Sequence, residues 1–277
     1  MVGGNENMSK ENTAVTKKKI KRCKEDVVFD AACFIILTLV LFVVAYPLYW
    51  VIISSISAPS AVSSGKVLLH PIGFTLKGYA EVFKNDQVMR GFLNSLIITF
   101  CGVMVNLIVT LPTSYALSRS NFSGKKPITI FYLITMFFGG GLIPTYLVIQ
   151  RLQMLNTIWA LILPGCLSVY NMIVARTFFK SNISEELYEA AEIDGCTQAR
   201  FFFQIALPLS KAIIAILVLY YGVGHWNSYF SALVYISDKA KYPLQLVLRN
   251  ILITNQTALS QTATTAAARA ALQEKQQ

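Results

Sequence analysis

Charged residues are scarce in this chain, and the scarcity is concentrated in five places. Only 14% of the 277 residues are Asp, Glu, Lys or Arg, whereas a soluble domain carries about a quarter. Five stretches contain none of these four residue types: 31–53, 91–118, 127–150, 152–175 and 212–237. Each is long enough for the roughly 20 residues that a membrane-spanning helix needs. Five such runs exclude a soluble fold, because a helix without a polar face has no surface to present to water.

Other features that the sequence lacks exclude further classes of protein. The first apolar run is too long for the core of a cleaved signal peptide. No phosphate-binding loop of the GxxxxGK[ST] type is present, so we expect no ATP binding, no enzymatic activity and no cofactor on this chain. The cysteines show neither metal-ligand spacing nor a disulfide framework. They are Cys23, Cys33, Cys101, Cys166 and Cys196.

The basic residues indicate an orientation in the membrane. They cluster in the amino-terminal arm, around 119–126 and over 176–211, and these regions lie on one side if five helices alternate. The positive-inside rule places that side in the cytoplasm, together with the amino terminus. Lysines in the opposite loop, 54–90, weaken this pattern without reversing it. The distribution of the net charge of +10 therefore follows from orientation in membrane lipid, and no nucleic-acid partner is expected.

These patterns predict an all-α membrane protein built as a bundle of transmembrane helices. We expect a disordered basic cytoplasmic arm over 1–26, a transmembrane domain over 27–253 and a polar extracellular segment over 254–277. The five visible helices are expected at about 27–53, 91–118, 127–149, 155–177 and 209–236. Near the outer end of the third helix, Gly139, Gly140, Gly141 and Pro144 predict a bend or close packing.

The loop over 178–208 is predicted to form two short helices. Ser184 is a good N-cap for the first, Gly195 suits its left-handed end, and Thr197 can cap the second. At 100° per residue the acidic residues of the first helix share one face: Glu185, Glu189 and Glu192. The opposite face holds Leu187, Ala190 and Ala191. This pattern alone leaves two alternatives equally open, a docking element and an ordinary amphipathic linker.

The same loop resembles the EAA loop of ABC importer permeases at every fixed position. The match is Glu189-Ala190-Ala191, three residues, Gly195, nine residues, Ile205, one residue and Leu207-Pro208. In that family the loop forms a coupling helix that sits in a groove of the ATPase subunit. The resemblance implies that seven residues make this contact: Glu189, Ala190, Ala191, Asp194, Gly195, Leu207 and Pro208.

Other segments resemble the carbohydrate-uptake permeases of the maltose-transporter class. They are Asn94-Ser95-Leu96, Tyr115 to Arg119, Gly141 to Tyr146, Asn156 to Ala160 and Gly224 to Ser228. The last of these, together with Tyr242 to Leu246, looks most like the subgroup linked to complex oligosaccharides in Gram-positive bacteria. The resemblance covers 27–253. Because family members have a sixth helix that returns the chain to the cytoplasm, we expect that helix to follow Gln277.

The resemblance also implies partners and a mechanism. In the bacterial plasma membrane, a second homologous permease subunit would complete the pathway by alternating access. A cytoplasmic ATPase dimer would hold ATP and Mg, and an extracellular solute-binding protein would deliver an oligosaccharide. Two rival functions are open to such a membrane protein. An ion-driven transporter would need intramembrane carboxylates and internal repeats, and neither is seen; a non-transporting scaffold or sensor would use the loop for signalling.

Polar and aromatic side chains inside the apolar spans are candidates for a sugar pathway, because polar groups are costly in a membrane. They are Asn106 on the second helix, Tyr170 and Asn171 on the fourth, and His225, Trp226, Asn227 and Tyr229 on the fifth. The alternative for each is a hydrogen bond between helices or an interfacial position. A proton relay through His225 is not expected, since none of the five uncharged stretches holds a carboxylate.

Overall fold

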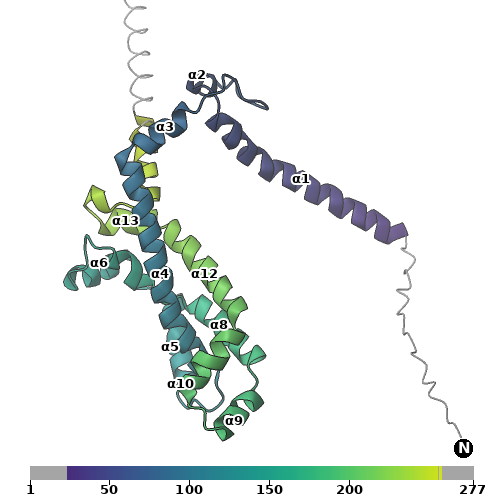
Figure 1. The fold of residues 1–277 in the computed structure, drawn as a ribbon, viewed down its shortest axis with the longest axis vertical. Helices are drawn as coiled ribbons and strands as arrows, with labels where there is room; N and C mark the ends of the chain where they lie inside the picture. The colour runs from purple at the N-terminus through teal and green to yellow at the C-terminus, as the bar shows by residue number, and fades with distance from the viewer. Residues whose placement is uncertain (1–23, 255, 258–277) are drawn as a thin grey trace, which may run out of the picture. The chain divides into compact units, whose positions relative to one another are not determined.

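The computed structural model describes residues 24–254 and 256–257, which form helices joined by turns, with no strand among them (Figure 1). The all-α prediction is confirmed. The contacts divide the chain into two units, Met1–Ala80 and Glu81–Gln277. Most of the predicted arm and most of the predicted polar segment after Ile253 lie outside the described residues.

Unit 1 contains the first long apolar helix and a loop folded back on its end. Its helices are α1 (Lys24–Ser55), α2 (Pro59–Ser63) and the first residues of α3 (Lys77–Lys84). Trp50 Nε1 donates a hydrogen bond of 2.8 Å to the carbonyl of Val67, and the Tyr49 hydroxyl donates one of 2.6 Å to the carbonyl of Leu69. The aromatic residues at the end of α1 therefore hold the loop that follows.

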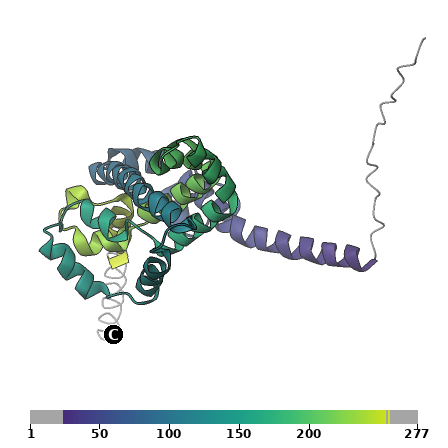
Figure 2. The same ribbon diagram turned by 90° about the horizontal axis from the view of Figure 1, so that it is seen from below.

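Unit 2 is organised around one continuous helix, α4 (Asp86–Ser118). The side chain of Asn85 caps it by accepting hydrogen bonds from the amides of Gln87 and Val88. Along its length α4 packs against α8 (Val169–Asn182) and α12 (Lys211–Trp226), which lie beside it in both views (Figures 1 and 2). The small and polar residues on its buried face allow this close approach. They include Gly91, Ser95, Gly102, Asn106, Thr110 and Ser114.

The remaining helices of unit 2 are short. Between α4 and α8 lie α5 (Lys125–Phe137), α6 (Leu142–Arg151), α7 (Trp159–Ile162) and the 3₁₀ turn η1 (Leu163–Gly165). Between α8 and α12 lie α9 (Glu185–Ile193), α10 (Gln198–Phe201), the π-helix η2 (Phe202–Ala206) and α11 (Leu207–Leu209). After α12 come α13 (Tyr229–Tyr235), the 3₁₀ turn η3 (Lys239–Lys241) and a helix over Leu244–Thr254.

Three of the five predicted spans are broken rather than straight. Among the residues that the structure describes, only Val28–Ser55 and Asp86–Ser118 are long and apolar enough to cross a membrane alone. Three helix pairs qualify only jointly, with bends of 113° between α5 and α6, 53° between η1 and α8, and 80° between α11 and α12. Counting each bent pair as one span gives five.

The bend predicted near residues 139–141 and Pro144 is confirmed, but it divides the single helix predicted over 127–149. Helix α5 ends at Phe137 and α6 begins at Leu142, because three consecutive glycines, 139–141, have low helix propensity. The helix predicted over 209–236 is likewise divided, with α12 ending at Trp226 and α13 beginning at Tyr229. The helix predicted over 155–177 is interrupted between η1 and α8.

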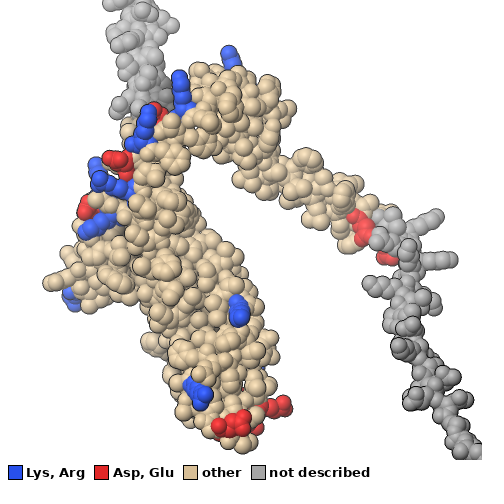
Figure 3. Space-filling view, in the orientation of Figure 1, with Lys and Arg blue, Asp and Glu red and all other residues tan. Residues whose placement is uncertain are grey.

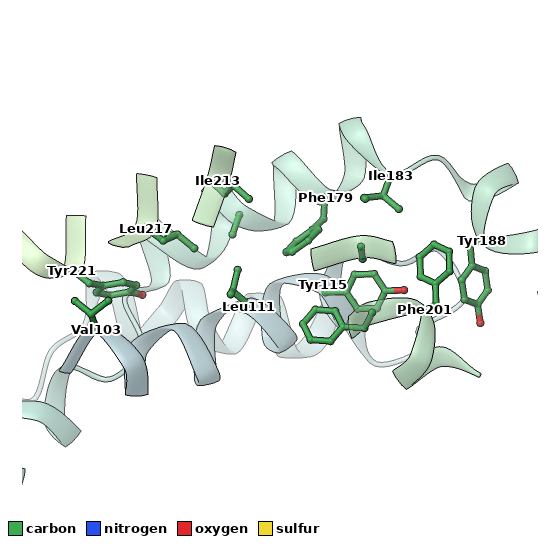
Figure 4. Close-up of a cluster of buried hydrophobic side chains, with 13 residues drawn as sticks. Val103, Leu111, Tyr115, Phe179, Ile183, Tyr188, Phe201, Ile213, Leu217 and Tyr221 are labelled. Carbon is green, nitrogen blue, oxygen red and sulfur yellow. The ribbon is translucent and has the colours of Figure 1, made fainter. Parts of the chain in front are cut away.

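The largest buried cluster of unit 2 runs from the middle of α4 and α12 to the helices of the 184–209 segment (Figure 4). Val103, Leu217 and Tyr221 lie at one end of this cluster, and Tyr188 and Phe201 lie at the other. On the face of unit 2 shown in Figure 3, acidic side chains gather at the end that carries α9. Most of the surface between the two ends of the unit is uncharged, as a membrane-facing belt requires.

Candidate functional site

The segment that resembles the EAA loop folds as a helix–turn–helix whose local signals act as predicted. The Ser184 hydroxyl accepts the Leu187 amide at 3.3 Å, and the Thr197 hydroxyl accepts the Arg200 amide at 3.3 Å. Gly195 has φ of +77°, where residues with a Cβ are strained. Its left-handed turn lets the Cys196 amide donate to the carbonyl of Ala191 at 2.9 Å, which closes α9. The predicted caps and the predicted helix end are confirmed.

The division of α9 into an acidic and an apolar face needs correction. Its buried face is made by Tyr188, 7% exposed, and by the half-buried Ala191. The Tyr188 ring packs edge-on against Phe201, with 5.3 Å between the ring centroids. Since Tyr188 has the largest apolar area of the helix, its position decides which face turns inward. Glu185 also turns inward, where it forms an ion pair of 3.2 Å with Arg119.

The outward face of α9 therefore mixes acidic and apolar side chains. Glu189, Glu192 and Ala190 are all exposed. Ile193 is 86% exposed, although an isoleucine is normally buried. A small apolar patch bordered by carboxylates has the composition of a protein-binding surface.

The seven residues that the resemblance selects do not all occupy this surface. Four of them are exposed at α9 and the turn after it: Glu189, Ala190, Asp194 and Gly195. Two others face the protein instead, since Ala191 and Leu207 pack against the buried cluster. Pro208 is exposed on α11. The structure thus separates residues that can touch a partner from residues that hold the segment in place.

Two of the candidate pathway residues are brought together, and they bond to each other. Asn106 is 1% exposed, and its Oδ1 lies 2.9 Å from His225 Nε2. Its Nδ2 donates to the carbonyl of Gly165 at 3.0 Å. These hydrogen bonds join α4, α12 and η1. They favour a structural role for Asn106 and His225, as an interhelix hydrogen bond, over contact with a sugar.

The other candidates are dispersed. Tyr170 and Tyr229 are exposed, whereas Asn171 is buried. Trp226 packs edge-on against Phe92, with centroids 6.0 Å apart. Trp226 and Asn227 line a shallow groove of about 350 Å³ that runs between α4 and α12. That groove includes neither Asn106 nor His225.

Comparison with known proteins identifies the family. No protein-family profile matches the chain. It is 38% identical over 225 residues to the polygalacturonan/rhamnogalacturonan transport system permease protein YtcP of Bacillus subtilis, a match that covers 81% of this chain and 78% of YtcP. It is 39% identical over 226 residues to the B. subtilis protein LplC, covering 82% and 76% of the two chains. The chain belongs to the family of ABC sugar-transporter permease subunits.

A solved structure agrees with this assignment. The permease resembles a chain from a bacterial ABC transporter involved in the import of the acidic polysaccharide alginate, with a TM-score of 0.79 and 28% identity. The match covers 83% of this chain and 81% of that one. A more distant relative is the galactooligosaccharides transport system permease protein GanQ of B. subtilis, 29% identical over 228 residues. The expected fold class and transport function are confirmed.

The permease contains a buried polar link that the sequence analysis missed. The Tyr221 hydroxyl lies 2.8 Å from the Thr110 hydroxyl, and it accepts the amide of Ser168 at 3.2 Å. A signal for this link is present in the sequence, because small or polar residues recur every fourth position on α4. They are Gly102, Asn106, Thr110 and Ser114.

Proposed function

We propose that this permease couples to a separate ATPase through the outward face of α9 and forms one half of a sugar pathway. One observation carries the proposal: α9 exposes carboxylates beside Ile193 while Tyr188 fastens its other face to the core. An exposed isoleucine among carboxylates, on a helix whose opposite face is buried against the core, offers a partner both an apolar and a charged contact. A partner with a basic, apolar groove would satisfy both chemistries.

The charges support an orientation with α9 in the cytoplasm. Basic residues accompany the acidic α9 at this end of unit 2, among them Lys125, Lys126 and Lys180. Short loops rich in lysine and arginine stay on the cytoplasmic side. We place the ATPase dimer, with its ATP and Mg, at this end, and a second permease subunit beside this chain. An extracellular solute-binding protein would meet the opposite end.

We assign the substrate to oligosaccharides from acidic polysaccharides. YtcP and the alginate transporter bear names that point to this class, and every galacturonate unit carries a carboxylate. At the end of unit 2 away from α9, Arg90 and Lys239 line a cavity of about 230 Å³ with Asp86 and Gln87. Exposed cations on the outer side run against the positive-inside trend and would attract an anionic sugar.

Co-purification tests the ATPase contact. The complete chain, expressed with its partner permease, is purified with the ATPase as wild type, as Glu189→Lys and as Glu81→Lys. Both substitutions reverse one exposed carboxylate, but Glu81 lies on α3. We expect the wild type and Glu81→Lys to retain the ATPase and Glu189→Lys to lose most of it. Equal retention by all three chains would remove α9 from the contact and favour the scaffold alternative.

Uptake by proteoliposomes tests the substrate class. We expect trigalacturonate to be imported and neutral maltotriose to be imported poorly. The preference should weaken as salt is raised, because a Debye length of about 8 Å at physiological ionic strength shortens further at higher salt. Equal import of both trisaccharides would refute the acidic-sugar assignment.

A further inference from the structure

Arg119, the residue directly after α4, is embedded among the helices of the 184–209 segment. Its guanidinium carbon lies 4.3 Å from the centroid of the Tyr188 ring, 5.7 Å from that of Tyr115 and 6.0 Å from that of Phe201. Its Nη2 lies 3.2 Å from Glu185 Oε2, and only 13% of the Arg119 side chain is exposed. One side chain attached to α4 thus contacts both α9 and α10.

These surroundings suit a guanidinium group specifically, and not merely any side chain of similar volume. Burying a charge carries a free-energy cost unless the charge is compensated, and an aliphatic side chain would fill the space without that cost. Here the Glu185 carboxylate, within ion-pair distance of Nη2, and the Tyr188 ring, 4.3 Å from the guanidinium carbon, lie closest to the cation. A planar cation that stacks and pairs at once fixes both the distance and the orientation of its partners.

Neighbouring polar contacts tie the same region together. The Ser120 hydroxyl bonds to the Glu185 carboxylate. Lys125 Nζ, at the start of α5, donates to the carbonyls of Arg119 and Ser120 at 3.2 Å each. The ends of α4, α5 and α9 therefore meet around Arg119.

The backbone connection from α9 to α12 is less able to transmit a displacement. The chain passes through the π-helix η2 and then bends by 80° before α12, and such a break separates the two helices mechanically. Side-chain packing, in contrast, runs without a break from α9 to α4 and α8. The Tyr188 and Phe201 rings lead to Tyr115 on α4 and to Phe179 on α8 (Figure 4).

We propose that Arg119 is a positioning residue that locks α9 to α4, so that a displacement of α9 by the ATPase moves the transmembrane helices. This inference rests on the proposed docking of the ATPase on α9. Arg119 is not part of the outward face of α9, because it belongs to the end of α4 and packs on the ring of Tyr188. Its loss should leave ATPase binding in place and should lower the amount of sugar moved for each ATP hydrolysed.

The test uses the assembled transporter in proteoliposomes and measures three quantities: ATPase retained, ATP hydrolysed and trigalacturonate imported. Arg119→Gln removes the cation, whereas Arg119→Lys keeps the charge without the planar fork. Lys180→Gln is the matched control, since it removes an exposed cation from α8 at the same end. Tyr188→Leu keeps the Arg119–Glu185 pair and removes only the ring beneath the guanidinium.

We expect Arg119→Gln to retain wild-type amounts of ATPase while import per ATP falls about tenfold, the factor to which about 1.4 kcal/mol corresponds. Arg119→Lys and Tyr188→Leu should fall between Arg119→Gln and the wild type, and Lys180→Gln should match the wild type. Unchanged import per ATP in Arg119→Gln, or in Arg119→Lys and Tyr188→Leu together, would overturn the inference. Loss of the ATPase from Arg119→Gln would also overturn it, by making the residue part of assembly. If the wild type itself retains no ATPase, the proposed function fails, whatever the variants do.

Discussion

The crossing of α4 and α12 depends on Gly102, and this dependence gives a quantitative prediction. A Cβ at position 102 would lie 2.5 Å from His225 Nε2 and 2.6 Å and 2.7 Å from two other atoms of the same ring. Contacts below 3.0 Å do not persist, so Gly102→Ala must rotate the ring or separate the helices. The ring is not free to rotate, because it is hydrogen-bonded to the buried Asn106.

The magnitude follows from these two effects. Overpacking a close contact costs about 1–3 kcal/mol. Leaving the buried Asn106 without its partner costs about 1–3 kcal/mol more. We expect Gly102→Ala to lower the free energy of unfolding by about 2–6 kcal/mol.

A double-mutant cycle isolates the cause. In His225→Ala the ring is absent, so adding Gly102→Ala should cost less than about 1 kcal/mol. The assay is reversible unfolding of the purified permease in mixed detergent micelles, followed by tryptophan fluorescence. Equal costs of Gly102→Ala in the wild type and in His225→Ala would refute the claim that the glycine makes room for the ring.

Three further predictions concern other contacts. Tyr221→Phe removes the hydroxyl shared by Thr110 and the Ser168 amide and should lower the free energy of unfolding by about 1–3 kcal/mol; no change in the same assay would contradict this. Asn94→Ala frees the carbonyls of Ala240 and Tyr242, so amide hydrogen exchange over 238–244 should accelerate while exchange in α8 stays constant. Gly195→Val places a β-branched residue at φ of +77° and should weaken ATPase retention more than Gly165→Val, because Gly165 has no such backbone constraint. Equal retention would contradict that reasoning.

The sequence predicts local features of the permease well when they depend on short-range chemistry. The capping roles of Ser184 and Thr197 and the left-handed turn at Gly195 follow from side-chain chemistry within a few residues. The apolar runs likewise show where the spans lie, since the membrane imposes their length. The breaks without a glycine run are less visible, because a span bent at Ser210 or interrupted at Asn227 has the same composition as a straight one.

The sequence does not predict which side chains of the site turn inward. The helical wheel of α9 places Glu185 on a free acidic face, but Arg119 lies 66 positions earlier in the chain and draws it inward. The pairing of Asn106 with His225 likewise joins helices that are far apart in sequence. Periodicity identifies which residues share a face, and tertiary contacts decide which face is buried.

The measurement that tests the central claim most directly is photo-crosslinking from α9. A benzophenone amino acid placed at Ile193, which is 86% exposed, is compared with one at Leu252, which is 62% exposed on the helix over Leu244–Thr254. In the assembled transporter we expect position 193 to crosslink to the ATPase and position 252 to give no such product. A crosslink from position 252, or none from position 193 in a complex that contains the ATPase, would contradict the account.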